Sequence, residues 1–331
     1  MSELYPLKFE PILKEKIWGG SSLADYYGKK PGNLKYIGES WELSAVSENL
    51  SVISNGFLAG NNIEEIIEVY MGDITGDSVF EKFGNEFPLL IKLIEAKDDL
   101  SVQVHPDDGL AKERHQAYGK TEMWHILKSE KAAKIYTGFS RPVTSETYIN
   151  AIKNNSIESL LNIESADPGD TFFTPAGRIH AIGAGIVLAE IQQTSDITYR
   201  IYDWGRKDKN GKSRDLHTDL ALDAIDFNQA GKSKIISELH KNKSKNLVRC
   251  KYFDTNIIQF NEQFARDYNL IDSFVVYICT EGRFEIHWDS GSERVSKGET
   301  VLLPAMISDV VLVPDQEATL LETYISDIGI H

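Results

Sequence analysis

Gly169–His180 reads GDTFFTPAGRIH, and Gly298–Asp309 reads GETVLLPAMISD. In each stretch a glycine is followed by five residues and then by Pro-Ala. The β-branched and aromatic residues before the proline predict a strand, and the Pro-Ala pair predicts a turn into a second strand. Two such units, roughly 130 residues apart, predict a duplicated β-barrel architecture. The alternative is that this spacing recurs by chance, and the flanking residues have to decide between the two.

The composition restricts the class of protein. The 331 residues include 50 Asp and Glu against 35 Lys and Arg, which gives a net charge of −15. Proteins that bind nucleic acids usually carry an excess or a cluster of basic residues that contact the phosphates. This sequence shows neither, so we expect no nucleic-acid partner. Two cysteines, Cys250 and Cys279, provide neither a disulfide framework nor a CxxC motif. The N-terminal stretch is charged and no apolar run approaches the roughly 20 residues that cross a bilayer, so we expect a cytoplasmic protein without a membrane segment.

The length predicts more than one domain, since a domain usually takes roughly 100–200 residues. Residues 1–55 are expected to form short extended pieces, and the Lys-rich and Ser-rich stretch 231–246 is the best candidate for a linker. We predict a first domain at 1–245 and a second, built of strands and turns, at 246–331. Helical spacing of apolar residues within the first domain predicts three helical segments, at about 60–83, 144–163 and 215–225.

Polar side chains alternate with apolar ones on two predicted strands. In LSVQVHPDD, residues 100–108, alternation places Ser101, Gln103 and His105 on one face. In the next segment it places Lys120 and Glu122 on one face. A glutamate in an apolar strand is costly to bury unless it is paired or binds a metal. The alternative reading is a solvated sheet face.

His180 follows the predicted PAG turn and adds a further candidate ligand. A single histidine on a strand is more often a core residue than a ligand. Two imidazole nitrogens, one carboxylate and one amide oxygen would nevertheless form a four-ligand site with a preference for zinc, although Mn, Co, Ni or Fe also fit this donor set.

The spacing GxxxxxPxGxxH, from Gly169 to His180, resembles the second signature of the cupin barrels. The copy that begins at Gly298 departs from it, with Met306 in place of the second glycine and Asp309 in place of the histidine. Over essentially the whole chain, the sequence resembles the type I mannose-6-phosphate isomerases (phosphomannose isomerases) in their short bacterial form. The segments that carry this resemblance are GESWELS at 38–44, PLLIKLIEAKDDLSVQVHPDD at 88–108, KTEMWHIL at 120–127 and FFTPAGRIHAIGAGIVLAEIQQTSDITYRIYDWGR at 172–206.

The resemblance implies a mainly β fold of two cupin-type (jelly-roll) barrels with a small helical insertion, the second barrel having lost its metal ligands. It implies one Zn²⁺ per chain and a sugar phosphate as the small-molecule partner. The expected metal ligands are Gln103, His105, Glu122 and His180. The expected catalytic residues are Arg200, Glu190 and Lys120, and the expected substrate-binding residues are Glu39, Lys92, Ser101 and Arg206. Arg206 stands where some relatives have a lysine.

The activity implied is the interconversion of mannose 6-phosphate and fructose 6-phosphate through a cis-enediolate. Such chemistry needs a positioned base for the carbon-bound proton and positive charge for the oxyanion. Glu190 and Lys120 are the two candidates for the base, and Arg200 is the candidate for stabilising negative charge. The rival functions are a cupin with another metal-dependent reaction and a non-catalytic sensor of sugar phosphates. We expect a monomer or a weak homodimer.

Overall fold

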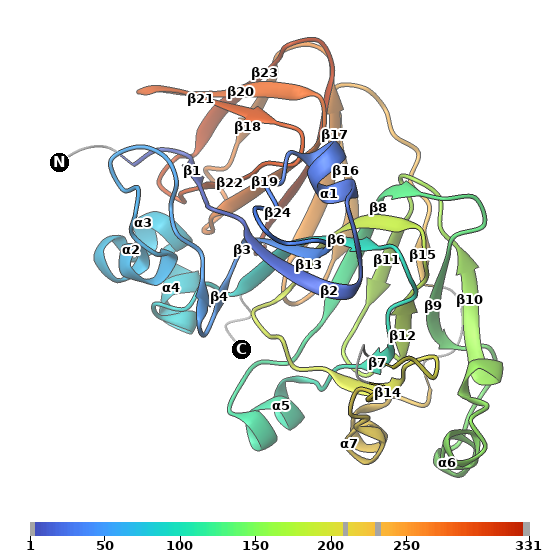
Figure 1. Ribbon diagram of the computed structural model, residues 1–331. Coiled ribbons are helices and arrows are strands. Elements are labelled where there is room, and N and C mark those ends of the chain that lie inside the picture. Colours follow the sequence, from blue (N-terminus) through green and yellow to red (C-terminus); the bar gives the residue numbers. More distant parts are fainter. Residues whose placement is uncertain (1–3, 208–210, 229–232, 327–331) are drawn as a thin grey trace.

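Antiparallel sheets make up most of the computed structural model, which describes residues 4–207, 211–228 and 233–326 (Figure 1). The prediction of a mainly β protein is thus confirmed. Four larger sheets pair off in two units, and a short ribbon of β4 (Ala45–Val46) and β5 (Asn49–Leu50) lies beside the first. Within the described ranges, no helix has the length and apolar character needed to cross a membrane.

The first unit combines a seven-stranded and a five-stranded sheet. The seven-stranded sheet has the order β15 (Lys234–Ile235), β11 (Thr171–Thr174), β8 (Glu122–Ser129), β13 (Ile186–Gln193), β6 (Leu89–Ala96), β3 (Ile37–Leu43), β2 (Ile12–Gly20). The five-stranded sheet has the order β10 (Leu161–Ser165), β9 (Lys134–Phe139), β12 (His180–Ile182), β7 (Val102–Val104), β14 (Tyr199–Tyr202). Trp124, Phe172 and Leu188 of the larger sheet share one apolar cluster with Ile135 and Ile182 of the smaller. The two sheets therefore enclose a common interior.

The second unit repeats this arrangement with a six-stranded and a four-stranded sheet. The six-stranded sheet has the order β1 (Leu7–Lys8), β22 (Thr300–Leu303), β19 (Val275–Glu281), β24 (Ala318–Tyr324), β17 (Asp254–Phe260), β16 (Lys243–Arg249). The four-stranded sheet has the order β18 (Phe264–Asp267), β23 (Asp309–Pro314), β20 (Arg283–Trp288), β21 (Gly291–Ser296). Buried side chains of both sheets, such as Tyr277, Phe284 and Leu312, form the core between them.

The two stretches with the same spacing fold in the same way. Strand β11 lies in the larger sheet of its unit, and β12 after the Pro-Ala turn lies in the smaller one. Likewise, β22 lies in the larger sheet of the second unit and β23 in its smaller sheet. Each stretch therefore crosses from one sheet to the facing one, so the repeated spacing reflects a repeated structure.

The two units share a core. Leu89 and Ile91 of β6 belong to the same apolar cluster as Val276 and Ile278 of β19, and β1 from the N-terminal end pairs with β22. The predicted boundary at 245/246 falls inside β16, because that strand begins at Lys243. The predicted linker, 231–246, lies partly outside the described residues and also contains β15.

The helices lie outside the sheets (Figure 1). They are α1 (Ser22–Tyr27), α2 (Ile63–Tyr70), α3 (Gly72–Thr75), α4 (Asp77–Phe83), α5 (Asp108–His115), α6 (Ser145–Lys153) and α7 (Thr218–Ala224), with a 3₁₀ turn at Ile157–Leu160. Helices α2, α3 and α4 lie at one side of the molecule, and α5, α6 and α7 lie at one end of the first unit (Figure 1). Helix α2 starts at a capping box between Asn62 and Glu65. Two predictions need correction: 21–27, expected to be extended, contains α1, and the helical segment predicted at 144–163 ends early because β10 starts at Leu161 and pairs with β9.

A buried carboxylate fills the interior of the second unit. Glu322 on β24 is fully buried and accepts hydrogen bonds from Arg266 (2.8 and 2.9 Å), Tyr268 (2.5 Å) and Asn256 (2.8 Å). On the two adjacent strands, Glu322 is paired with Asn256 of β17 and with Tyr277 of β19. The guanidinium of Arg266 thus compensates the buried negative charge.

Replacing Glu322 by Ala is expected to lower the free energy of unfolding by about 3–5 kcal/mol, because Arg266 would keep a largely buried charge without its partner. Urea denaturation of the purified variant measures this loss. Glu285, a partly exposed residue of β20 that pairs with the exposed His287, provides the control, since Glu285→Ala should change stability by less than about 0.5 kcal/mol. If the two variants were equally stable, the proposed charge compensation between Glu322 and Arg266 would be wrong.

Candidate metal centre and active site

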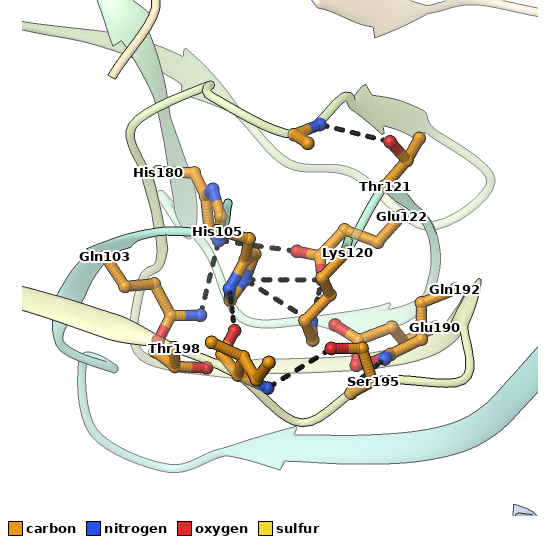
Figure 2. Close-up of polar contacts among 12 residues, drawn as sticks. Gln103, His105, Lys120, Thr121, Glu122, His180, Glu190, Gln192, Ser195 and Thr198 are labelled. Carbon is orange, nitrogen blue, oxygen red and sulfur yellow. Dashed lines mark hydrogen bonds and ion pairs between the residues drawn. The ribbon is translucent and has the colours of Figure 1, made fainter. Parts of the chain in front are cut away.

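Three buried side chains from three segments of the first unit meet at one end of its interior (Figure 2). His105 follows β7, Glu122 begins β8, and His180 begins β12; one ligand atom from each lies within 4.8 Å of the other two. Glu122 and His180 are fully buried, and His105 is 1% exposed. His105 Nε2 lies 3.5 Å from Glu122 Oε2, and His180 Nε2 lies 3.4 Å from Glu122 Oε1. The three residues thus form a compact donor set.

Backbone carbonyls orient both imidazoles. His105 Nδ1 donates to Ile197 O at 2.8 Å, and His180 Nδ1 donates to Arg178 O at 2.7 Å. Each Nε2 is therefore unprotonated, and its lone pair faces the carboxylate of Glu122. Histidines that bind a metal usually have this arrangement. Burial lowers the pKa of His180 to about 3 and, together with Lys120, lowers the pKa of His105 well below its usual value. Both imidazoles are therefore neutral at physiological pH, as ligands must be.

Glu122 completes the donor set. Burial raises the pKa of its carboxyl to about 7 even though the nearby Lys120 ammonium lowers it. Lys120 Nζ contacts Glu122 Oε2 and lies 3.3 Å from His105 Nε2, whereas Glu122 Oε1 has no hydrogen-bond partner among the described residues. A buried acceptor that faces another lone pair is unfavourable unless a cation lies between them. The donor chemistry therefore fits a metal ion.

Gln103 lies beside this group, as the alternation on its strand predicts. Its amide nitrogen is 3.3 Å from His180 Nε2, and residues 103 and 180 are paired between β7 and β12. Val102 and Val104 point the other way into a buried cluster. The amide of Gln103 is thus within reach of a shared ion.

A second polar group occupies the neighbouring strands β6, β8 and β13. Glu190 accepts from Lys92 Nζ at 3.0 Å and from Trp124 Nε1 at 2.8 Å. Lys92 also donates to Gln192 Oε1 at 2.8 Å. Burial alone would raise the pKa of Glu190, but the ammonium groups of Lys120 and Lys92 outweigh it and lower that pKa to about 2. Glu190 is therefore ionised and fixed in place at neutral pH.

These groups border a cavity of about 250 Å³, here called the active-site cavity. Of the residues predicted from the sequence, those that line it are Glu39, Lys92, Ser101, Gln103, Lys120, Glu190 and Arg200. Arg200 on β14 donates to Ser101 Oγ at 3.3 Å and to Asp215 O at 3.0 Å. The structure therefore brings seven predicted residues to one cavity, with the metal donor set next to Gln103 and Lys120.

Arg206 is placed differently from these residues, because it is not among those that line the cavity. Its guanidinium donates to Asp99 O at 2.7 Å and to Asp203 Oδ1 at 2.8 Å. Asp203 also accepts from Arg214, and it is Arg214 that reaches the active-site cavity. The arrangement is thus a carboxylate held between two arginines, of which Arg214 is the one facing the cavity.

The sequence reasoning missed several lining residues, among them Lys16, Asp196, Thr198 and Arg214. Lys16 forms an ion pair with Glu39 at 3.0 Å. Period-two alternation along β2, with Lys16 two residues before Trp18, would have pointed to it. Arg214 had no such signal, because it lies in a loop whose position depends on Asp203.

Comparisons with known proteins identify the family of this chain. A model of the family described as phosphomannose isomerase type I, catalytic domain, matches residues 6–150. The mannose-6-phosphate isomerase ManA of Bacillus subtilis is 34% identical over 305 residues, which cover 90% of this chain and 93% of the relative. A mannose-6-phosphate isomerase of Streptococcus mutans is 32% identical, covering 91% and 93% of the two chains. A crystal structure of the mannose 6-phosphate isomerase from Bacillus subtilis superimposes with a TM-score of 0.85 at 30% identity, covering 96% of this chain and 99% of the other. The chain therefore belongs to the type I phosphomannose isomerase family.

Proposed function

We propose that this protein interconverts mannose 6-phosphate and fructose 6-phosphate and that its metal is zinc, one ion per chain. The observation that carries this proposal is the set of His105, Glu122 and His180 beside a cavity lined by cationic side chains. Two neutral imidazoles and a carboxylate are typical of catalytic zinc sites that keep a position open. Gln103 would supply a fourth ligand through its amide oxygen. When bound, zinc would provide Lewis-acid stabilisation of negative charge on the sugar oxygens.

The charges of the active-site cavity suit a small dianion. Its lining includes five cationic side chains (Lys16, Lys92, Lys120, Arg200 and Arg214) and three carboxylates (Glu39, Glu190 and Asp196), an excess of two positive charges. A local excess of this kind attracts a phosphate even in a chain whose net charge is −15, because local fields decide small-ligand binding. We propose that Ser101 and Arg214 hold the phosphate, with Arg200 beside them. In this scheme Arg206 contributes by fixing Asp203, which orients Arg214.

The chain offers Lys120 and Glu190 as bases for the carbon-bound proton. A general base works best when its pKa is near the operating pH, and the pKa of Glu190 is near 2. Glu190 is thus a weak base, and Lys120 can act as a base only after its ammonium group, which contacts Glu122, loses a proton, so both residues stay candidates for the proton transfer. Arg200 would stabilise the negative charge of the enediolate.

We propose that the two pairs of sheets are two cupin-type barrels, of which only the first is catalytic. The repeated crossing of β11–β12 and β22–β23 between facing sheets supports this. In the second barrel Asp309 takes the place of His180, and among the described residues His105, Glu122 and His180 form the one cluster suited to a metal. The boundary is better placed between β15 and β16 than at 245/246. We further propose that the protein is a monomer or a weak homodimer.

A coupled assay tests the proposed activity. Zinc-loaded protein should convert mannose 6-phosphate to fructose 6-phosphate, and glucose 6-phosphate run in parallel tests discrimination at the sugar C2 position. We expect turnover with mannose 6-phosphate within the common range of roughly 1–10³ s⁻¹. If neither sugar phosphate reacts but mannose 6-phosphate still binds, the non-catalytic sensor is the correct function instead.

A further inference from the structure

A second cavity, of about 410 Å³, lies where the two units join, and it shares no lining residue with the active-site cavity. It is here called the β22 cavity, because Thr300 at the start of β22 lines it, together with the loop after α1. Gly298 brings these segments together: a Cβ at this position would lie 2.3 Å from Tyr27 O. The cavity is thus built by the second copy of the repeated sequence, which the metal site does not use.

Basic side chains dominate the lining of the β22 cavity. Four lysines (Lys8, Lys29, Lys30 and Lys297) face two carboxylates (Glu42 and Glu299). Lys29 is only 6% exposed and donates to Glu42 Oε2 at 2.7 Å and to Gly298 O at 2.6 Å. Among the lining residues, amines exceed carboxylates by two, a local balance that favours an anionic ligand.

Of the other three lysines, Lys8 is fully occupied by its partners, whereas Lys297 and Lys30 keep donors available. Lys8 pairs with Glu299 and with Glu293, and Lys297 pairs with Glu281; Glu293 and Glu281 do not line the cavity. Lys30 is exposed and forms no ion pair or hydrogen bond with any described residue. Its ammonium can therefore reach a ligand without breaking an existing contact.

An unpartnered hydroxyl points to a ligand independently of the charges. Thr300 is 5% exposed, and its Oγ1 has no hydrogen-bond partner among the described residues. Thr171, at the matching position of the first repeat, is bonded to His125 Nδ1 at 3.0 Å. A buried hydroxyl without a partner is costly, and because Thr300 belongs to the cavity lining, rotation of its side chain would let a ligand in the cavity satisfy this hydroxyl.

The position of the β22 cavity connects it with the active site. Strand β3 separates the two cavities: Glu39 and Trp41 line the active-site cavity, whereas Glu42 lines the β22 cavity. An anion that replaced Glu42 as the partner of Lys29 would therefore change the contacts of β3, the strand that also carries Glu39. This shared wall gives an occupant of the β22 cavity a short route to the catalytic groups.

We propose that the β22 cavity is a second ligand site, for a small phosphate monoester. A phosphate group offers several acceptor oxygens, which match the separate donors Lys29, Lys30 and Thr300, and lysine binds phosphate as a point charge. The cavity volume exceeds what a bare phosphate ion fills, which leaves room for a short carbon skeleton beside the apolar lining residues Phe9 and Leu13. The site is distinct from the active-site cavity, with which it shares no lining residue.

Calorimetric titration of the metal-loaded protein with glycerol 2-phosphate tests this proposal. We expect two binding events, one in each cavity. Thr300→Val and Lys30→Ala should each weaken one of the two events about tenfold, the usual effect of losing one hydrogen bond to a charged group. Both variants should keep kcat and KM for mannose 6-phosphate in the absence of the added ligand. A crystal soaked in glycerol 2-phosphate should show a phosphate group next to Thr300 Oγ1.

The matched control is Lys35→Ala, which removes an exposed lysine that does not line the β22 cavity and should leave both events unchanged. A single binding event that neither Thr300→Val nor Lys30→Ala alters would overturn the proposal. A parallel titration with inorganic phosphate distinguishes binding of a phosphate monoester from binding of the free phosphate ion. Equal affinity for inorganic phosphate at the second site would show recognition of the free anion and refute a monoester site.

Discussion

Stripping the metal from the protein with a chelator is expected to lower kcat for mannose 6-phosphate at least about a thousandfold, with recovery when Zn²⁺ is added back. The physical reason is that a bound metal ion contributes several kcal/mol of charge stabilisation, and about 4 kcal/mol corresponds to a thousandfold in rate. His180→Ala should reproduce the loss without a chelator, because it removes one of only three strong donors. The coupled assay, together with metal analysis of each sample, measures both effects.

His125 provides the matched control for the metal prediction. It is a buried histidine on β8, the strand of Glu122, but it is bonded to Thr171 Oγ1 and is not part of the donor set. His125→Asn should therefore keep one equivalent of metal and most of the activity. Full turnover in protein shown to contain no metal would refute the assignment of the three ligands to catalysis.

Arg200→Ala is expected to lower kcat by about 10²–10³-fold while the fold is retained. Arg200 is half-buried at the cavity wall, where a charged donor aimed at developing negative charge typically contributes this much. Arg200→Lys should recover only part of the rate, because an ammonium group cannot reproduce the separate contacts to Ser101 and Asp215. Steady-state kinetics with circular dichroism as the check on folding measures the effect.

Arg249→Ala serves as the control for Arg200, since Arg249 is an exposed residue of β16 that pairs with Asp254 outside the active-site cavity. Its kcat should equal that of the unaltered protein. If Arg200→Ala raised KM alone and left kcat intact, the guanidinium would bind the phosphate in ground state and transition state equally and would not stabilise the enediolate.

The alternation of residues points to candidate metal donors that the structure brings together: Gln103, Glu122 and His180 lie on strands, and His105 directly follows β7. Alternation put Gln103 on the face opposite Val102 and Val104, and the structure shows those valines buried in another cluster. The strand, turn and strand of Gly169–His180 brought His180 into the facing sheet, next to Gln103. Periodicity is a local property, so it could be read without knowing how the sheets pack.

Residues outside the strands were harder to place. Arg206 was expected at the substrate, but Asp203 and the carbonyl of Asp99 hold its guanidinium away from the cavity lining. Arg214 lines the cavity instead, although it lies in a loop with no periodic pattern. Helix α1 and the early end of the helical segment at 144–163 were missed because short segments follow their tertiary partners more than their own propensity.

The sequence by itself determined the repeat, the mainly β fold and the candidate donor residues, because strand alternation and the Gly-to-Pro-Ala spacing act between near neighbours in the chain. Only the tertiary structure decided which side chains share a cavity. It placed Lys92 and Trp124 on Glu190, joined both units in one core, and formed the β22 cavity between α1 and the second repeat. These contacts join residues far apart in sequence, and they depend on how the sheets pack and on how buried charges find partners, which no local pattern specifies.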